Sequence, residues 1–499
     1  MSSISWASLY LISEWIIRIG MLVAVPFRRS PEAAKGWLLF GFFLPWPALA
    51  LYLAIGRPAY PRWRRERFAR LPAVLARTAA PVLEAQAAGT PVLPANLAQA
   101  ATLIRNLGHF PSLGGNSVEL LSDYDGTLRR LAADIDGARS HVHLLFYIFA
   151  DDGSGRTIIE ALARAVRRGV ACRVLIDALG SRAWAPRTVA ALEAAGVAVR
   201  LVLPVGLMRR HSTRADLRNH RKIAVIDGRI GFVGSQNVVD ADFNPRVVNR
   251  ELVARVTGPV VIELQAVFVA DWFLETEEVL EDPTLFPAPA PDESSRASAA
   301  GEVPDDPALF PAPPPAGGAV AQVLPSGPDY PGAGIERLLD ALVHGARERV
   351  VLTTPYFVPD DALLRAMETA TLRGVEVHLV LSKPVDQILV NLAQRSYYAE
   401  LLEAGVAIHL YRDRLLHAKH ASIDREIALI GSSNIDMRSF TLNAEISLVL
   451  FDSDATARLH AVEEEYFANS ERLSAEAWRA RPLRARIVEN VARLLSPLL

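Results

Sequence analysis

A pattern that occurs twice is the feature that most constrains this chain. Each copy holds a histidine, a lysine two residues later, an aspartate and a Gly-Ser-x-Asn string. The copies are His220, Lys222, Asp227 and Gly234 to Asn237, and His417, Lys419, Asp424 and Gly431 to Asn434. Every shared position of the second copy lies 197 residues after its counterpart. Two strings in one register are very improbable by chance, so we predict two similar half-sites that meet in one active site.

The segments around both copies alternate between strand-like and helical patterns. Strands are expected at 143–149, 170–177 and 197–203, with helices at 157–168 and 187–195. The second half repeats this order, with strands at 349–354, 375–381 and 406–410 and helices at 362–372 and 394–403. A glycine follows each helix, where a C-cap is expected. Such alternation predicts a largely parallel sheet packed by helices, duplicated in tandem. The first half has an additional Arg-rich insert, 204–219, before His220.

The N-terminal segment departs from the composition of a soluble protein. Residues 6–27 and 36–55 are apolar, and each stretch has about the 20 residues that cross a bilayer as a helix. We therefore predict a hairpin of two transmembrane helices, with Glu14 and Arg18 paired on one helix face. Six arginines follow the second stretch, namely Arg57, Arg62, Arg64, Arg65, Arg67 and Arg70. Basic residues next to membrane spans are enriched on the cytoplasmic side, so these arginines favour a cytoplasmic position for the rest of the chain. The same basic run could also rest on anionic headgroups.

These patterns predict five regions. They are the hairpin (1–58), a basic helical connector (59–115), a first α/β domain (116–281), a Pro- and Ala-rich linker (282–318) and a second α/β domain (319–499). The linker cannot bury a core and is expected to be solvated and partly extended. The tail from residue 478 is predicted to be an amphipathic helix that either packs on the catalytic body or contacts the membrane.

Charge and cysteine content exclude several classes of function. The chain has 53 basic and 55 acidic residues, so no general surface for nucleic acid or another polyanion is indicated. The one cysteine, Cys172, lies in an apolar strand and has no partner for a disulfide. No spacing of His, Cys and Asp matches a metal site. We therefore expect neither a metal nor another cofactor.

The residues of the duplicated pattern suit a phosphate ester. On an extended strand, residues two apart share a face, so each motif directs an imidazole and an ammonium group into one pocket. The Gly-Ser-x-Asn strings add hydroxyl and amide groups beside a glycine that would let the backbone approach a ligand. We predict that the phosphate is bound by the lysines together with Ser235, Asn237, Ser432 and Asn434.

Two histidines suit a two-step displacement, in which one attacks phosphorus and the other protonates the leaving alkoxide. Each needs a carboxylate on its second ring nitrogen to fix its tautomer. Glu251 and Glu445 are candidates, because each follows a Gly-Ser-x-Asn string by a short interval. Asp227 and Asp424 belong to the catalytic motif, but we expect them to bond backbone near a strand turn.

The two His-x-Lys strings with their aspartates resemble those of the phospholipase D superfamily. Further strings are similar to the bacterial cardiolipin synthases, namely Tyr52 to Arg57, Thr353 to Asp360, Leu416 to Lys419, Ser433 to Phe440, Leu442 to Glu445 and Leu494 to Leu499. The first copy departs from that family, which usually has Gly-Gly-x-Asn where this chain has Gly-Ser-Gln-Asn.

The resemblance implies two tandem α/β/α domains with pseudo-twofold symmetry, behind a transmembrane hairpin in the bacterial inner membrane. The implied reaction converts two phosphatidylglycerol molecules into cardiolipin and glycerol. His220 is favoured as nucleophile and His417 as general acid and base, with the reverse assignment open. The alternatives are a hydrolytic phospholipase D, a transferase using another lipid such as phosphatidylethanolamine, a nuclease, and a lipid-binding scaffold without activity.

Overall fold

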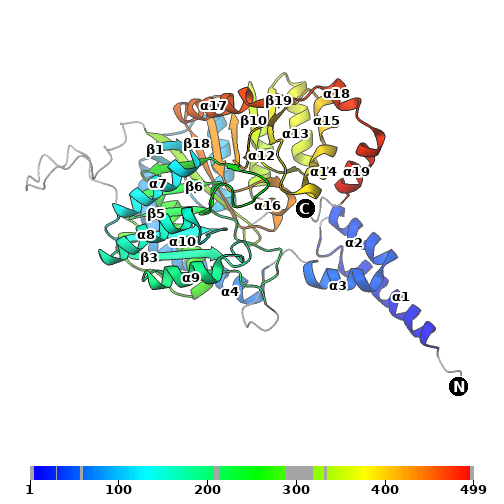
Figure 1. Cartoon of the computed structure of the whole chain (residues 1–499), viewed down its shortest axis with the longest axis horizontal. Helices are drawn as coiled ribbons and strands as arrows, with labels where there is room; N and C mark the ends of the chain where they lie inside the picture. The colour runs from blue at the N-terminus through cyan, green and yellow to red at the C-terminus, as the bar shows by residue number, and fades with distance from the viewer. Residues whose placement is uncertain are drawn as a thin grey trace, which may run out of the picture.

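One long mixed sheet runs through the catalytic part of this computed structural model (Figure 1). The structure describes residues 5–29, 31–56, 60–206, 213–287, 318–330 and 334–494. Predictions for Arg57, for Arg209 to His211, for most of the linker and for the last five residues lie outside these ranges.

The strand order reads alike outward from the centre of the sheet. The first half contributes β1 (Leu113–Leu121), β8 (Val253–Thr257), β6 (Ile230–Gly234), β5 (Ile223–Ile226), β2 (His141–Phe146), β3 (Ala171–Asp177) and β4 (Ala198–Val202), in that spatial order. The second half contributes β9 (Ala319–Ser326), β18 (Glu445–Phe451), β16 (Ile427–Gly431), β15 (His420–Ile423), β10 (Arg349–Thr353), β12 (Glu376–Ser382), β13 (Ala407–Tyr411) and β19 (Ser470–Arg472).

Both halves combine parallel and antiparallel strand pairs in the same arrangement. β2, β3 and β4 are parallel to one another, as are β10, β12 and β13, while the motif strands next to them pair antiparallel. β1 and β9 pair antiparallel where the halves meet, with a register shift between Leu113 and Asn116. The predicted α/β architecture is therefore confirmed, but the motif strands make each half a mixed sheet.

Helices cover both faces of the sheet. α10 (Val261–Thr276) and α17 (Ser453–Ala468) lie on one face, and their Phe268 and Leu459 belong to a single apolar core that includes Val225 and Ile430 from the two halves. The other face carries α7 (Tyr124–Asp136), α8 (Gly153–Arg167) and α9 (Ala185–Ala194) in the first half. In the second half it carries α12 (Gly334–Gly345), α13 (Asp361–Leu372), α14 (Ile388–Ser396) and α15 (Tyr398–Glu403).

Equivalent helices begin and end in equivalent ways. Asp152 caps α8 and Asp360 caps α13, each accepting a backbone N–H three residues on. Gly169 and Gly374 follow these helices with φ of 88° and 87°, the left-handed region that glycine adopts without strain. The helix predicted at 394–403 is divided between α14 and α15 at Tyr397. The predicted tail helix is likewise divided, into α18 (Ala475–Arg479) and α19 (Leu483–Arg493).

The N-terminal segment contains α1 (Trp6–Ala24), α2 (Pro31–Phe43) and α3 (Pro45–Ile55). Within the described ranges, α1 is the one helix long and apolar enough to cross a membrane. The second apolar stretch, expected as one span, is broken at Leu44, because Pro45 lacks the N–H that would continue the helix. Arg18 pairs with Glu14 at 3.1 Å, as expected, and also donates to the carbonyl of Phe42.

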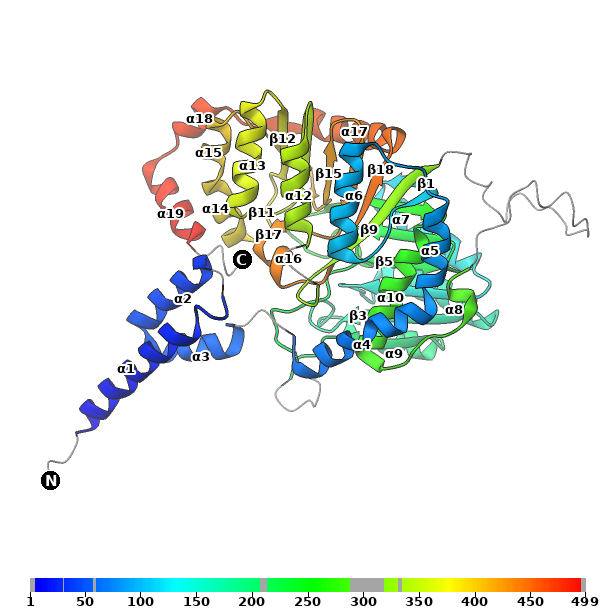
Figure 2. The same ribbon diagram turned by 180° about the vertical axis from the view of Figure 1, so that it is seen from behind.

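Three connector helices tie the N-terminal segment to the sheet. α4 (Arg62–Thr78) packs on α10, and α5 (Ala80–Ala88) packs near β1. α6 (Ala95–Gly108) crosses to the second half and lies beside α12 over β9 (Figure 2). The connector helices therefore contact both halves of the sheet.

Candidate active site

The backbone next to each motif histidine is bonded to the other half of the chain. β7 (Asn249–Arg250) pairs in parallel with β14 (Leu415–Leu416), and the N–H of His417 donates to the carbonyl of Arg250 at 2.8 Å. In the reciprocal contact, the N–H of His220 donates to the carbonyl of Ala444 at 2.8 Å. Residues 250 and 444 each directly precede a candidate glutamate, so the two contacts bring each histidine to the glutamate of the other half.

The side chains also pair across the two halves, each histidine with the glutamate of the other half. His220 Nδ1 lies 2.9 and 3.0 Å from the two carboxylate oxygens of Glu445. His417 Nδ1 lies 2.7 Å from Oε1 of Glu251. All four side chains are buried or nearly so. A carboxylate that accepts from Nδ1–H fixes the tautomer and leaves Nε2 of each imidazole to react.

Burial and the opposing charges set the protonation of these pairs. Burial lowers the pKa of His220 to about 4, against the opposing effect of Glu445. Burial also lowers the pKa of His417, again opposed by its glutamate. Burial alone would raise the pKa of Glu251 and Glu445, but the histidine facing each carboxylate reverses the shift and lowers it. The site therefore holds ionised carboxylates beside neutral imidazoles when no substrate is bound.

The two motif lysines occupy matching positions. Nζ of Lys222 donates to the carbonyl of His220 at 2.6 Å, and Nζ of Lys419 donates to that of His417 at 2.6 Å. Each lysine also lowers the pKa of the other half's histidine, so the two half-sites share one electrostatic environment. Burial lowers the pKa of Lys222 to about 7 and that of Lys419 to about 8. Their positive charge is thus sensitive to pH near neutrality.

The glycine and serine of each Gly-Ser-x-Asn string face the neighbouring strand. A Cβ on Gly234 would lie 2.4 Å from the carbonyl oxygen of Leu252, and one on Gly431 would lie 2.4 Å from that of Ile446. The hydroxyls of Ser235 and Ser432 accept the N–H of the same two residues at 3.0 Å. The glycines therefore permit close strand packing, and the buried serines bond the strand that carries each glutamate. The contact of Ser235 and Ser432 with a phosphate stays a prediction.

Ser432 has a further contact, because its hydroxyl donates to Oε2 of Glu445. Ser439, in the short α16 (Met437–Thr441), donates to Oε1 of the same carboxylate at 3.1 Å. Two hydroxyls and His220 thus hold Glu445.

The two asparagines differ in their contacts. Oδ1 of Asn237 accepts the N–H of Ile148 at 3.0 Å, which orients its amide NH₂ for another partner. Oδ1 of Asn434 is buried and accepts no hydrogen bond within the described part of the chain.

Asp227 and Asp424 bond backbone, as we expected. Each has a positive φ, 53° and 52°, at the turn between its motif strands. The carboxylate of Asp227 accepts the N–H groups of residues 139–141 at 2.7 to 2.9 Å. That of Asp424 accepts those of residues 347–349. These aspartates fix the start of the neighbouring strands β2 and β10.

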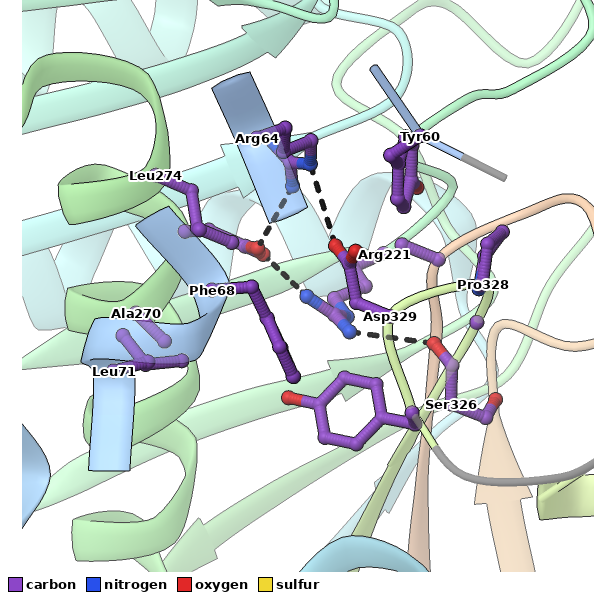
Figure 3. A pocket seen from close by; sticks show the side chains of 14 residues that line it. Tyr60, Arg64, Phe68, Leu71, Arg221, Ala270, Leu274, Ser326, Pro328 and Asp329 are labelled. Carbon is purple, nitrogen blue, oxygen red and sulfur yellow. Dashed lines mark hydrogen bonds and ion pairs between the residues drawn. The ribbon is translucent and has the colours of Figure 1, made fainter. Parts of the chain in front are cut away.

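Residues outside the predicted set also hold the first motif. Arg221, between the motif histidine and lysine, donates to the backbone carbonyl of Glu445 at 3.0 Å and to Asp271 of α10 at 2.6 Å. Arg64 of α4 lies 3.9 Å from the other oxygen of Asp271. It also lies 3.4 Å from Asp329 (Figure 3). All of these charges are buried, so the network joins the juxtamembrane helix to the strand of His220. Its members lie far apart in the sequence, and spacing alone gave no signal for it.

The insert before His220 also contributes. Arg218 is buried and pairs with Asp177 at 3.1 Å, while the N–H of Asn219 donates to the same carboxylate.

An aromatic ring lies edge-on against each motif histidine. The ring centroids of Tyr147 and His220 are 4.8 Å apart, and those of Tyr356 and His417 are 6.5 Å apart.

Comparison with known proteins agrees with this geometry. A family model described as "Cardiolipin synthase, PLD-like domain" matches residues 131–272 and 339–467. Cardiolipin synthase A of Pectobacterium atrosepticum is 35% identical over 512 residues, covering 99% of both chains. The enzymes of the same name from Serratia proteamaculans and Salmonella arizonae are 34% and 35% identical with the same coverage. The fold is also similar to that of a phosphatidylserine synthase of Haemophilus influenzae, at a TM-score of 0.59 and 16% identity, covering 81% of this chain and 99% of that one.

Proposed function

Because the chain belongs to the cardiolipin synthase family of phospholipase-D-like proteins, we propose that it transfers a phosphatidyl group between two phosphatidylglycerol molecules. The products are cardiolipin and glycerol. The observation that carries the proposal is the exchange of carboxylates between the halves, which leaves Nε2 of both His220 and His417 for one phosphodiester.

In the first step, Nε2 of His220 attacks phosphorus and forms a P–N bond. The P–O bond to the glycerol headgroup breaks, and His417 gives the leaving alkoxide its proton. The low pKa of His220, about 4, keeps its ring neutral and nucleophilic. His417 carries the proton in the substrate complex, where the phosphodiester adds a negative charge beside it.

In the second step, the headgroup hydroxyl of another phosphatidylglycerol attacks the same phosphorus. His417 accepts the proton of this hydroxyl, and the P–N bond breaks to regenerate His220. Lys222, Lys419, Asn237 and Asn434 stabilise the charge on the non-bridging oxygens. Glu251 and Glu445 keep both imidazoles in the reactive tautomer and balance the charge that each ring gains.

The two half-sites are proposed to be related by a pseudo-twofold axis between β1 and β9. The matching strand order supports this relation, as do the reciprocal contacts of residues 220 with 444 and 417 with 250. The boundaries 116–281 and 319–499 are proposed for the two domains.

The membrane arrangement is also a proposal. α1 would cross the bacterial inner membrane, and α2 and α3 together would return as a broken second pass. The excess of arginines in α4 supports a cytoplasmic position for the catalytic domains.

The activity is tested by incubating the purified chain with phosphatidylglycerol in mixed micelles and analysing the lipids by mass spectrometry. The proposal predicts cardiolipin and an equal amount of glycerol, with none formed by the His220→Ala or His417→Ala variant. Phosphatidic acid as the main product would show a hydrolase instead. A second reaction that contains phosphatidylethanolamine reports whether that lipid is also used.

The nucleophile is tested by quenching the reaction in alkali, where phosphohistidine survives. Peptide mass spectrometry should find a phosphatidyl group on His220. Its recovery on His417 would reverse the two roles.

A further inference from the structure

α19 turns its large apolar side chains away from the protein. Five of them are more than half exposed, namely Leu483 (68%), Ile487 (54%), Val488 (51%), Val491 (57%) and Leu494 (78%) at its C-cap. The buried positions of the same helix are Glu489 and Ala492. A helix that packs on a soluble body normally shows the opposite arrangement, with its apolar stripe inward.

The charged side chains of α19 also divide between its two faces, with the acidic one inward and basic ones outward. Glu489 is its one carboxylate, and it turns inward to Arg395 of α14 at 2.8 Å and to Arg481 at 2.7 Å. Arg484 and Arg486 are exposed. The outward face of the helix is therefore both apolar and basic.

α14 extends this face. It packs against α19 and exposes Ile388 (67%) and Leu389 (43%) at its first turn. We call the surface formed by Ile388, Leu389, Ile487, Val488 and Val491 the α14–α19 face.

The α14–α19 face lies next to the half-site of His417. The loop that leads into α14 contributes Asp386 and Gln387 to a pocket that Tyr356 also lines. The hydroxyl of Tyr356 donates to Asp386 at 2.6 Å, and its ring meets that of His417. Figures 1 and 2 place α19 at the end of the molecule from which α1, α2 and α3 extend.

We propose that the α14–α19 face rests in the interface of an anionic bilayer, beside the membrane segment. An amphipathic helix lies in that interface with its apolar side chains among the acyl chains and its arginines at the headgroups, as the exposed residues of α19 would. The proposal rests on the proposed function in one respect: the lipid then reaches His417 from the membrane surface without crossing water.

Labelling at single cysteines tests the position of this face in the full-length protein. Cys172 is buried at 5% exposure, so a cysteine introduced at Val488→Cys is the accessible thiol for an environment-sensitive fluorophore. Leu372→Cys on α13 is the matched control, because Leu372 is an apolar residue of 86% exposure outside the face. Both proteins are reconstituted in phosphatidylserine vesicles that contain lipids with a spin-label quencher on the acyl chain.

Quenching should be several-fold stronger at 488 than at 372, and it should weaken in vesicles of phosphatidylcholine alone. Equal quenching at the two positions would overturn the proposal. Energy transfer between fluorophores at 488 on two copies, in the absence of acyl-chain quenching, would assign the face to self-association and also overturn it. This readout needs no turnover, so it stays informative even if the wild-type protein forms no cardiolipin.

A second measurement compares two forms of substrate. The double variant Ile487→Ser/Val488→Ser should convert phosphatidylglycerol in vesicles several-fold more slowly than the wild type. It should keep the wild-type rate on short-chain phosphatidylglycerol dispersed as monomers. Leu372→Ser should change neither rate. An unchanged rate on vesicles would contradict the proposal, as would an equal loss on both substrates in a variant with wild-type thermal stability.

Discussion

Glu445 of the second half accepts a hydrogen bond from Nδ1 of His220 in the first half, at 2.9 Å. Glu251 and His417 make the reciprocal pair at 2.7 Å. Each motif histidine is therefore paired with a carboxylate of the other half. We therefore propose that the catalytic unit is the pair of halves, so that activity depends on their docking.

Glu445→Gln should lower kcat strongly, because a neutral amide no longer balances the charge of His220 and can also donate, which no longer restricts the ring to one tautomer. We expect a loss of about 10²- to 10⁴-fold, measured as cardiolipin formed per minute from phosphatidylglycerol. Glu464→Gln is the control, since that carboxylate is 62% exposed and pairs with Arg349 rather than with a motif histidine. A loss of less than about threefold for Glu445→Gln would show that the pair is not needed for catalysis.

The activity should fall as pH rises above neutrality. Burial lowers the pKa of Lys222 to about 7 and that of Lys419 to about 8, so the free enzyme loses these positive charges over that range. The kcat/KM for phosphatidylglycerol should decline accordingly. Lys222→Arg should be slower overall but show a smaller decline, because a guanidinium stays charged. Identical pH profiles for wild type and variant would exclude Lys222 as the titrating group.

Arg64→Met should destabilise the protein. Removing one partner of a buried ionic network leaves uncompensated carboxylates and costs about 3–5 kcal/mol of unfolding free energy. The control is Arg62→Met, whose exposed pair with Glu66 is worth less than about 0.5 kcal/mol. Thermal unfolding in mild detergent measures both. Equal melting temperatures for the two variants would contradict the role assigned to the Arg64 network.

Asp424→Ala separates a structural role from a catalytic one. The substitution leaves three backbone N–H groups without their acceptor and should cost about 1–3 kcal/mol of stability. Activity per folded molecule, measured well below the melting temperature, should fall far less than it does in His417→Ala. A loss as complete as that of His417→Ala, with unchanged stability, would place Asp424 among the reacting groups.

Sequence patterns predicted the parts of this structure that depend on residues close together in the sequence. The repeated motif singled out both histidines and both lysines, and the two glutamates were candidates because each follows a Gly-Ser-x-Asn string. The glycines marked the ends of α8 and α13. The sequence could not say which glutamate serves which histidine, because each follows its own motif by a similar interval. That choice depends on the pairing of β7 with β14 and of Asn219 with Ala444, which join distant segments.

Other features of the structure depend on contacts or helix breaks that motif spacing does not reveal. The sequence did not show that the neighbouring strand bonds the hydroxyls of Ser235 and Ser432, whose contact with a phosphate stays a prediction. The second apolar stretch was predicted as one helix because its length and apolar composition suit a membrane span, but the helix is broken before Pro45. The sequence left the docking of the tail helix open; α19 packs on α14 and exposes its apolar side chains.

The exchange of carboxylates is tested most directly by NMR of the protein labelled with ¹⁵N-histidine. The Nδ1–H protons of His220 and His417, assigned through His220→Gln and His417→Gln, should each give a strongly shifted signal. Glu445→Gln should move the signal of His220 and leave that of His417, and Glu251→Gln should do the reverse. If Glu445→Gln instead moves the signal of His417, or neither signal changes, the shared active site described above is wrong.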